Sequence, residues 1–207
     1  GGATVWAADV DDALGRELVQ GLGAPHRYAR LDVTDSDAWK HIVAEISLKH
    51  GGIDVLFLNA GIMFRPRGAP ALNDELISLV TENFQRYRQV MAVNCDGVLL
   101  GVLHGLPALE AKGGGAIVVM SSDSGLRPHP WDLAYGMSKR AVLSLVDTLA
   151  PLLAKRGVVM TAICPAGVDS GISPADFKAR RIREGHNYAT PDFAACAVET
   201  MLVRGKP

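Results

Sequence analysis

Short apolar runs alternate with longer stretches of helical period from one end of this chain to the other. The runs are rich in Val and Ile and show little polar alternation, which is typical of parallel strands covered on both faces. They span residues 3–8, 28–33, 53–58, 116–120 and 158–164. Between the first two runs, Leu14, Leu18 and Leu22 recur every four residues, as on one face of a helix. This order predicts an α/β fold with a doubly wound parallel sheet and helices on both faces.

Composition excludes several classes of protein. The 21 Lys+Arg balance 22 Asp+Glu, so the chain lacks the surplus of positive charge that nucleic-acid binding requires. Hydrophobic residues make up 48%, which excludes intrinsic disorder. Neither the cysteines nor the histidines have the spacing of metal ligands, so we expect no metal site. Without a signal peptide or an uninterrupted apolar run of about 18 residues, the sequence predicts a soluble, cytoplasmic protein with no membrane contact.

No shift in composition marks a second domain, so residues 1–207 are expected to form one α/β domain. Ligands of such a sheet bind beyond the carboxyl ends of its strands. The polar residues that follow the predicted strands should therefore gather at one edge. They are Asp9, Asp32, Asn59, Ser121 and Ser122.

Tyr135 and Lys139 stand four residues apart in a predicted helix, which places both side chains on one helical face. A phenol is a poor acid or base at neutral pH, but a cation within about 4–6 Å lowers the pKa of such an acid by roughly 1–3 units. Ser122, at a strand end, could hydrogen-bond a carbonyl or alkoxide oxygen. Asn94 interrupts an apolar helix, where a core amide bonded to the backbone is an equally good interpretation.

Five motifs together resemble the short-chain dehydrogenase/reductase family, in that family's order and roughly its spacing. They are Asn59-Ala60-Gly61, Val93-Asn94, IVVMSS at 117–122, YGMSK at 135–139 and CPAGVDS at 164–170. The resemblance covers almost the whole chain and implies a Rossmann-like sheet with a nicotinamide cofactor. It also implies an NAD(P)-dependent oxidoreductase that interconverts a secondary alcohol and a ketone by hydride transfer.

The resemblance implies a role for each matched residue. Tyr135 would be the general acid/base, and Lys139 would lower the tyrosine pKa and hold the nicotinamide ribose. Ser122 would orient the substrate oxygen, and Asn94 would hold a water that relays the proton. Besides Tyr135 and Lys139, the implied cofactor-binding residues are Asp9, Asp32, Val33, Asn59, Ala60, Gly61, Pro165, Gly167, Val168 and Ser170.

Asp9 bears on the choice of cofactor. A carboxylate at this strand end of a dinucleotide fold bonds the ribose hydroxyls and repels a 2′-phosphate, so Asp9 predicts NAD rather than NADP. The alternative is that Asp9 caps the following helix, although Asp11 or Asp12 could fill that role as well.

The family's first strand and its glycine-rich turn should precede Asp9 by about 20 residues, because that turn brings backbone N–H groups to the pyrophosphate. The chain begins too late to contain them, and it ends before the family's last strand. We therefore expect a fold that is incomplete at the N-terminus, in a fragment of a longer chain. The absent strand would lie between the strand ending at Asp9 and the one ending at Asn59.

Two other functions were weighed. A serine hydrolase is disfavoured because the G-x-S-x-G motif fails at both Ser122 and Ser138. A catalytically silent interaction module that lacks the phosphate-binding turn is a stronger alternative, with the apolar helices 90–109 and 141–153 as its surface. In the family these helices commonly form the subunit interface, so a homodimer or homotetramer is expected in either case. As an enzyme, the chain would take a small-molecule alcohol or ketone as its partner.

Overall fold

The computed structural model describes residues 2–64, 83–128, 133–173 and 175–204. The helix expected from about residue 71 lies outside the described residues. The elements are β1 (Trp6–Asp9), α1 (Asp12–Leu22), β2 (Arg27–Arg30), α2 (Ser36–His50), β3 (Val55–Leu58), α4 (Phe84–Met91), the π-helix η1 (Ala92–Asp96), α5 (Gly97–Glu110), β4 (Gly115–Met120), α6 (Asp123–Leu126), α7 (Leu133–Ala154), β5 (Val158–Ile163), α8 (Ala175–Arg183) and α9 (Pro191–Arg204).

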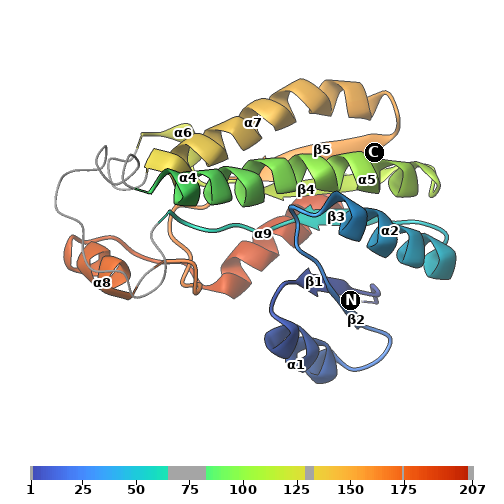
Figure 1. Ribbon diagram of the computed structural model, residues 1–207, viewed down its shortest axis with the longest axis horizontal. Helices are drawn as coiled ribbons and strands as arrows, with labels where there is room; N and C mark the ends of the chain where they lie inside the picture. Colours follow the sequence, from blue (N-terminus) through green and yellow to red (C-terminus); the bar gives the residue numbers. More distant parts are fainter. Residues whose placement is uncertain (1, 65–82, 129–132, 174, 205–207) are drawn as a thin grey trace.

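All five strands are parallel, but they form two sheets. β1 pairs with β2, and β3, β4 and β5 pair in that order. In the larger sheet Leu58 lies opposite Val119, and Met120 lies opposite Ile163, so the carboxyl ends of the strands meet at one edge. Among the described strands, β1 and β3 do not pair with one another (Figure 1). This break falls where the sequence predicts an absent strand.

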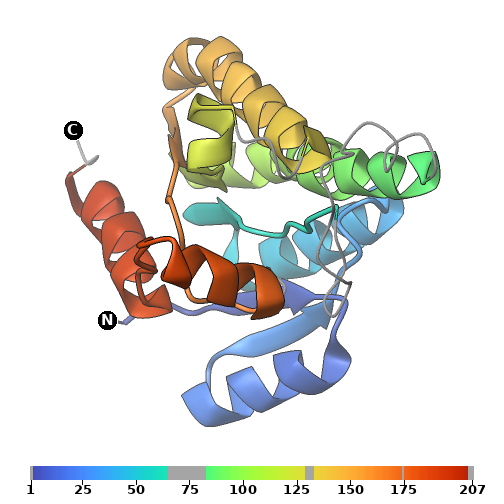
Figure 2. The same cartoon turned by 90° about the vertical axis from the view of Figure 1, so that its left-hand side faces the viewer.

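Helices cover both faces of the larger sheet. On one face α5 and α7 pack against the strands and α2 packs on α5, around a core that includes Ile117, Val119 and Val142. On the other face α9 packs through Val198 against Val118 and Ile163 (Figure 2). The doubly wound α/β architecture predicted from the sequence is therefore confirmed.

Short polar signals fix the helix ends. The carboxylate of Asp11 accepts hydrogen bonds from the backbone N–H groups of Ala13 and Leu14 at the start of α1, and Asp35 caps α2 in the same way. Gly51 ends α2 in the left-handed conformation, at φ 74°. Four of the five strands are shorter than predicted, whereas β4 begins one residue earlier than predicted. β2 ends at Arg30 rather than Val33, because the carboxylate of Asp32 instead makes a turn with Thr34.

One continuous helical segment, Phe84–Glu110, comprises α4, η1 and α5. Its length and hydropathy are sufficient to cross a membrane, a test that core helices of α/β folds also pass. Here Val98, Val102 and Leu109 pack in the main core, against the residues of the larger sheet. The apolar character of this segment is accounted for by that packing on its inner side.

Close packing between α1 and β2 requires a glycine at position 15. A Cβ atom at Gly15 would lie 2.0 Å from Cε2 of Tyr28, whose hydroxyl donates to Asp12 and to the Asp9 carbonyl. We expect Gly15→Ala to lower the free energy of unfolding by about 1–3 kcal/mol, because the ring must shift. Gly21→Ala in the same helix meets open space and should stabilise by about 0.5–1 kcal/mol. Urea denaturation of both variants tests the pair, and equal effects would contradict the expectation.

Candidate active site

The carboxyl end of β4 runs directly into two buried serines. Ser122 has extended backbone dihedrals and caps α6, since its Oγ accepts a hydrogen bond from the Ser124 N–H at 3.2 Å. The hydroxyl of Ser121 points the other way and donates to the Lys139 carbonyl at 3.0 Å. A Cβ atom at Gly125 would lie 2.8 Å from the same carbonyl oxygen, so α6 and α7 are in close contact. These contacts fix the segment with Ser121 and Ser122 against α7, the helix that carries Tyr135.

Lys139 is a lysine buried in the interior of the protein. Its side chain is buried, and its Nζ donates to the carbonyl of Met120 at 2.7 Å. Burial lowers the pKa of Lys139 from 10.5 to about 8, while the nearby Cys164 acts weakly in the opposite direction. The ammonium lies 5.5 Å from the centre of the Tyr135 ring. The predicted Tyr–Lys pair is thus on one face of α7, with the cation held at the end of β4.

Asn94 lies in η1 and is fully buried. Its Oδ1 accepts from the Ile62 N–H at 2.8 Å, and its Nδ2 donates to the Ile62 carbonyl at 2.9 Å and to Ser138 Oγ at 2.9 Å. Both amide hydrogens are used, while Oδ1 has one lone pair beyond its bond to Ile62. The structure shows the core amide bonded to backbone, and the water-holding role that the family resemblance implied stays a prediction. π-Helical turns are often found at functional sites, which agrees with this position.

The loop after β3 is held over the same region. A Cβ atom at Gly61 would lie 3.3 Å from Lys139 Nζ and 3.5 Å from Asn94 Oδ1, so a larger residue would crowd both. Arg86 of α4 donates to the carbonyls of Met63 and Phe64 at 2.6 and 2.9 Å. Asn59 and Ala60, which precede Gly61, are exposed at the strand end. The structure therefore brings Gly61, Asn94 and Lys139 together.

The smaller sheet presents two carboxylates at its own carboxyl end. Asp9 is exposed, and the helix-capping role is filled by Asp11, whose N–H donates to Asp9 Oδ1 at 2.9 Å. The N–H and hydroxyl of Thr34 donate to the carboxylate of Asp32 and lower its pKa. Val33 packs close to Gly97, where a Cβ atom would lie 2.7 Å from Val33 Cγ2.

Residues after β5 form the wall of a cavity of about 810 Å³, together with Tyr188 and α9. The Pro165 carbonyl accepts from the Asp123 N–H, which ties this loop to α6. Val168 makes a parallel bridge with Ala189, and the Ser170 N–H donates to the Val168 carbonyl at 2.7 Å. Tyr188 lies against Gly167, where a Cβ atom would be 3.1 Å from the ring. The four predicted residues of this loop, Pro165, Gly167, Val168 and Ser170, therefore lie together.

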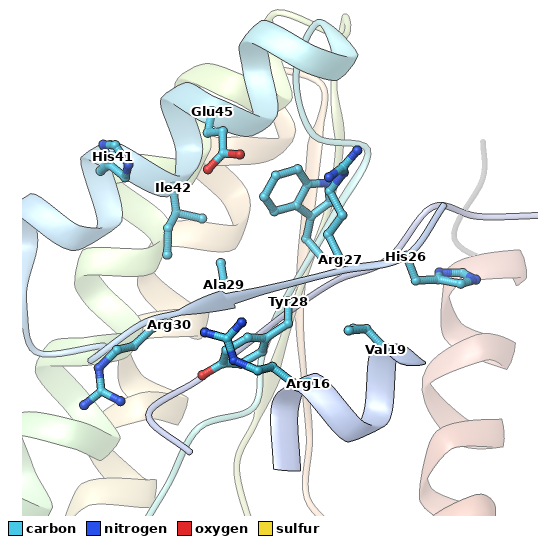
Figure 3. Close-up of a pocket in the computed structure, with 11 residues that line it drawn as sticks. Arg16, Val19, His26, Arg27, Tyr28, Ala29, Arg30, His41, Ile42 and Glu45 are labelled. Carbon is cyan, nitrogen blue, oxygen red and sulfur yellow. The ribbon is translucent and has the colours of Figure 1, made fainter. Parts of the chain in front are cut away.

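A second cavity, of about 510 Å³, lies at β2, the outer strand of the smaller sheet. Residues of α1 and α2 also line it (Figure 3). None of the predicted site residues lines it. Arg27 points to one side of β2 and Tyr28, with Arg16 against its ring, to the other, so the cations do not converge. Charged side chains along an edge strand discourage pairing with other chains. The charged residues of β2 are therefore explained without assuming a bound ligand.

The comparisons with known proteins agree with this geometry. A sequence model of the family described as short chain dehydrogenase matches residues 1–181. The chain belongs to the short-chain dehydrogenase family. It is 32% identical to tropinone reductase-like 2 of Erythroxylum coca, over 99% of this chain and 72% of that protein. It is 33% identical to a 3beta-hydroxysteroid dehydrogenase of Mediterraneibacter gnavus, over 86% of this chain but only 63% of that protein.

Solved structures share the fold. The crystal structure of gox2181 superposes with a TM-score of 0.82, covering 97% of this chain and 79% of that one, at 22% identity. An alcohol dehydrogenase from the archaeon Thermococcus sibiricus, complexed with 5-hydroxy-NADP, gives a TM-score of 0.73 over 99% of this chain and 80% of that one, at 23% identity. These structures show the fold alone, whereas the family match supports NAD(P)-dependent oxidoreduction, the chemistry of the short-chain dehydrogenases.

The described residues fit part of a nicotinamide dinucleotide. Gly61 has no side chain to crowd the amine of Lys139, and Asp9 presents a carboxylate beyond β1 that could accept ribose hydroxyls. The cavity beside Pro165 and Gly167 adds a mainly apolar wall. Within the described ranges, no glycine-rich turn opens a helix at this edge to receive a pyrophosphate. If the cofactor binds here, Asp9 would hold its adenosine ribose, and Gly61, Lys139 and the loop after β5 would hold its nicotinamide end.

Several contacts at the site were not foreseen. Ser138, Ser121 and Arg86 each fix a backbone segment that carries a predicted residue. The only sequence signal for Ser138 was its place inside the YGMSK motif, and Arg86 lies in a polar stretch with no motif. Hydrogen bonds between segments far apart along the chain have no local pattern, so only the structure could find them.

Proposed function

We propose that the protein interconverts a secondary alcohol and a ketone with a nicotinamide cofactor. The observation that carries the proposal is the buried amine of Lys139, held by the Met120 carbonyl at the end of β4 and 5.5 Å from the Tyr135 ring. A buried amine with a lowered pKa beside a phenol is typical of a site built for proton transfer. Family membership supports the same chemistry.

Each residue has a part in the proposed reaction. When bound, the nicotinamide supplies or accepts the hydride at C4. Tyr135 gives its phenolic proton to the substrate oxygen during reduction and takes it back during oxidation. Ser122 orients that oxygen, and Lys139 favours the phenolate and holds the nicotinamide ribose. Asn94 fixes the Gly61–Ile62 turn beside them through its hydrogen bonds with Ile62.

A binding titration tests the proposal. NADH and NADPH are added separately to the purified chain while tryptophan fluorescence is followed, after circular dichroism has established folding. Saturable binding, followed by turnover of a panel of secondary alcohols and ketones, would support the proposal. A folded chain that binds neither cofactor would instead favour the silent interaction module, the second candidate.

We expect Tyr135→Phe to lower kcat by about 10²–10⁴-fold, because the general acid/base is lost. NADH affinity should stay within about twofold, since ring and helix remain. Tyr87→Phe on α4, whose ring stacks on Phe84, serves as the matched control and should keep its activity. Steady-state kinetics of the two variants checks the prediction, and a Tyr135→Phe variant with unchanged kcat would contradict the assigned role.

We further propose that NAD is preferred, on the strength of the exposed Asp9 carboxylate. Asp9→Asn should raise the affinity for NADPH relative to NADH by about tenfold, or about 1.4 kcal/mol, because repulsion of the 2′-phosphate is removed. Asp37→Asn removes a similarly exposed charge from α2 and should leave the ratio unchanged. Fluorescence titration with both cofactors measures the ratio, and an equal change in the two variants would contradict this role.

We also propose a homodimer or homotetramer, formed through α5 and α7. Leu103 and Leu152 are 58% and 52% exposed on these helices, and such side chains gain by burial against a second copy. A reducing compartment such as the cytoplasm suits the three free cysteines, Cys95, Cys164 and Cys196.

A further inference from the structure

Ser138 is a buried hydroxyl between Tyr135 and Lys139 to which the proposed reaction gives no part. Its side chain is fully buried. Its Oγ donates to the Tyr135 carbonyl at 2.8 Å and accepts from Asn94 Nδ2 at 2.9 Å. A serine that only bonds the carbonyl three residues before it is common in helices. The additional bond to another helix is what distinguishes Ser138.

The donors and acceptors of the hydrogen bonds around Ser138 can be assigned in one way. Asn94 Oδ1 must accept from the Ile62 N–H, so its Nδ2 group supplies both remaining bonds, to the Ile62 carbonyl and to Ser138 Oγ. The hydroxyl hydrogen of Ser138 then goes to the Tyr135 carbonyl. This chain connects the loop after β3, the π-helix η1 and the first turns of α7.

We propose that Ser138 is a positioning residue. It holds the first turns of α7 against η1 and so keeps the Lys139 side chain buried beside Tyr135. The proposal deepens the proposed function and rests on it for its catalytic meaning. Ser138 itself does not touch the substrate. Without the hydroxyl, Asn94 has a buried amide hydrogen with no acceptor, and the contact between η1 and α7 loosens.

The consequence is measurable at Lys139 in the absence of any substrate. The groups that face its amine are Tyr135 on α7, Cys164 after β5 and the Met120 carbonyl. Burial holds the pKa of Lys139 at about 8. A looser α7 admits water, which relieves the desolvation and moves this pKa upward, toward 10.5. The pKa of Lys139 therefore reports whether its side chain is still buried.

The test is an NMR titration of the full chain with ¹⁵N-labelled lysine side chains, in which the Lys139 signal is identified by its loss in Lys139→Met. In Ser138→Ala we expect the Lys139 midpoint to rise by at least about 0.5 pH unit. Ser138→Thr, which keeps a hydroxyl, should return toward the wild-type midpoint. Thr148→Ala is the matched control, because Thr148 donates only to the Ser144 carbonyl of its own helix.

An unchanged Lys139 midpoint in a folded Ser138→Ala would overturn the proposal, even if that variant were less stable. Should Ser138→Ala not fold, the side-chain amide hydrogens of Asn94 are followed in the wild type instead. Slow exchange with solvent supports the bond to Ser138, and rapid exchange of both hydrogens overturns it. Neither measurement needs a cofactor, so a failure of the proposed oxidoreductase function would be seen separately, in the titrations with NADH and NADPH.

Discussion

Replacing Lys139 by methionine is expected to make the protein more stable at neutral pH while removing its proposed chemistry. The pKa of Lys139 falls from 10.5 to about 8 because the amine is buried. Below about pH 8 the folded chain carries the charged ammonium in a buried site. The lowered pKa corresponds to a loss of about 3 kcal/mol in the free energy of unfolding. Methionine removes the charge at similar length. It leaves the Met120 carbonyl without its donor, which costs about 1–2 kcal/mol, so a net gain of about 1–2 kcal/mol remains.

The pH dependence gives the sharper result. Between about pH 8 and pH 10.5 the folded chain has released the proton of Lys139 and the unfolded chain still holds it, so the stability of the wild type rises with pH. The advantage of Lys139→Met should therefore shrink by about 2 kcal/mol between pH 7 and pH 9.5.

Urea denaturation of wild type and variant at both pH values measures this difference and cancels the titrating groups that do not interact with Lys139. Lys155→Met, at an exposed position directly after α7, is the control and should show no such trend. A difference between wild type and Lys139→Met that does not change with pH would mean that the buried amine keeps an ordinary pKa.

The second large effect is expected at Asn94. Asn94→Ala removes three hydrogen bonds and leaves the N–H and carbonyl of Ile62 and the hydroxyl of Ser138 without this partner. At about 1–3 kcal/mol for each of the two Ile62 backbone groups left unsatisfied, we expect a loss of about 2–6 kcal/mol in the free energy of unfolding.

Aspartate at position 94 should not rescue the fold. It can accept from the Ile62 N–H, but its second oxygen would face the Ile62 carbonyl, which needs a donor. Urea denaturation of both variants, with Asn187→Ala at an exposed site as control, measures the effect. A loss below about 1 kcal/mol in Asn94→Ala would show that the Ile62 turn does not depend on this amide.

Much of the fold followed from local patterns. Apolar runs predicted the five strands, because strands covered on both faces are rich in apolar residues, although the outer strand β2 also carries Arg27 and Arg30. The ends of α2 are set by residues that are local in sequence, Asp35 before the helix and Gly51 after it. The strand ends were placed too late at β2, since Asp32 uses its carboxylate for a turn with Thr34 rather than continuing the strand. Local competition of this kind between side chain and backbone is not visible in hydrophobic periodicity.

The sequence by itself determined which residues could do chemistry. Tyr135 and Lys139 share a helix face because of their spacing of four, and Ser122 follows a strand because of the run before it. Only the tertiary structure decided how Lys139 is desolvated, and that Asn94 spends its amide on Ile62 and Ser138. Desolvation and long-range hydrogen bonds depend on segments brought together from β3, η1, β4 and α7, and no local stretch of sequence contains that information.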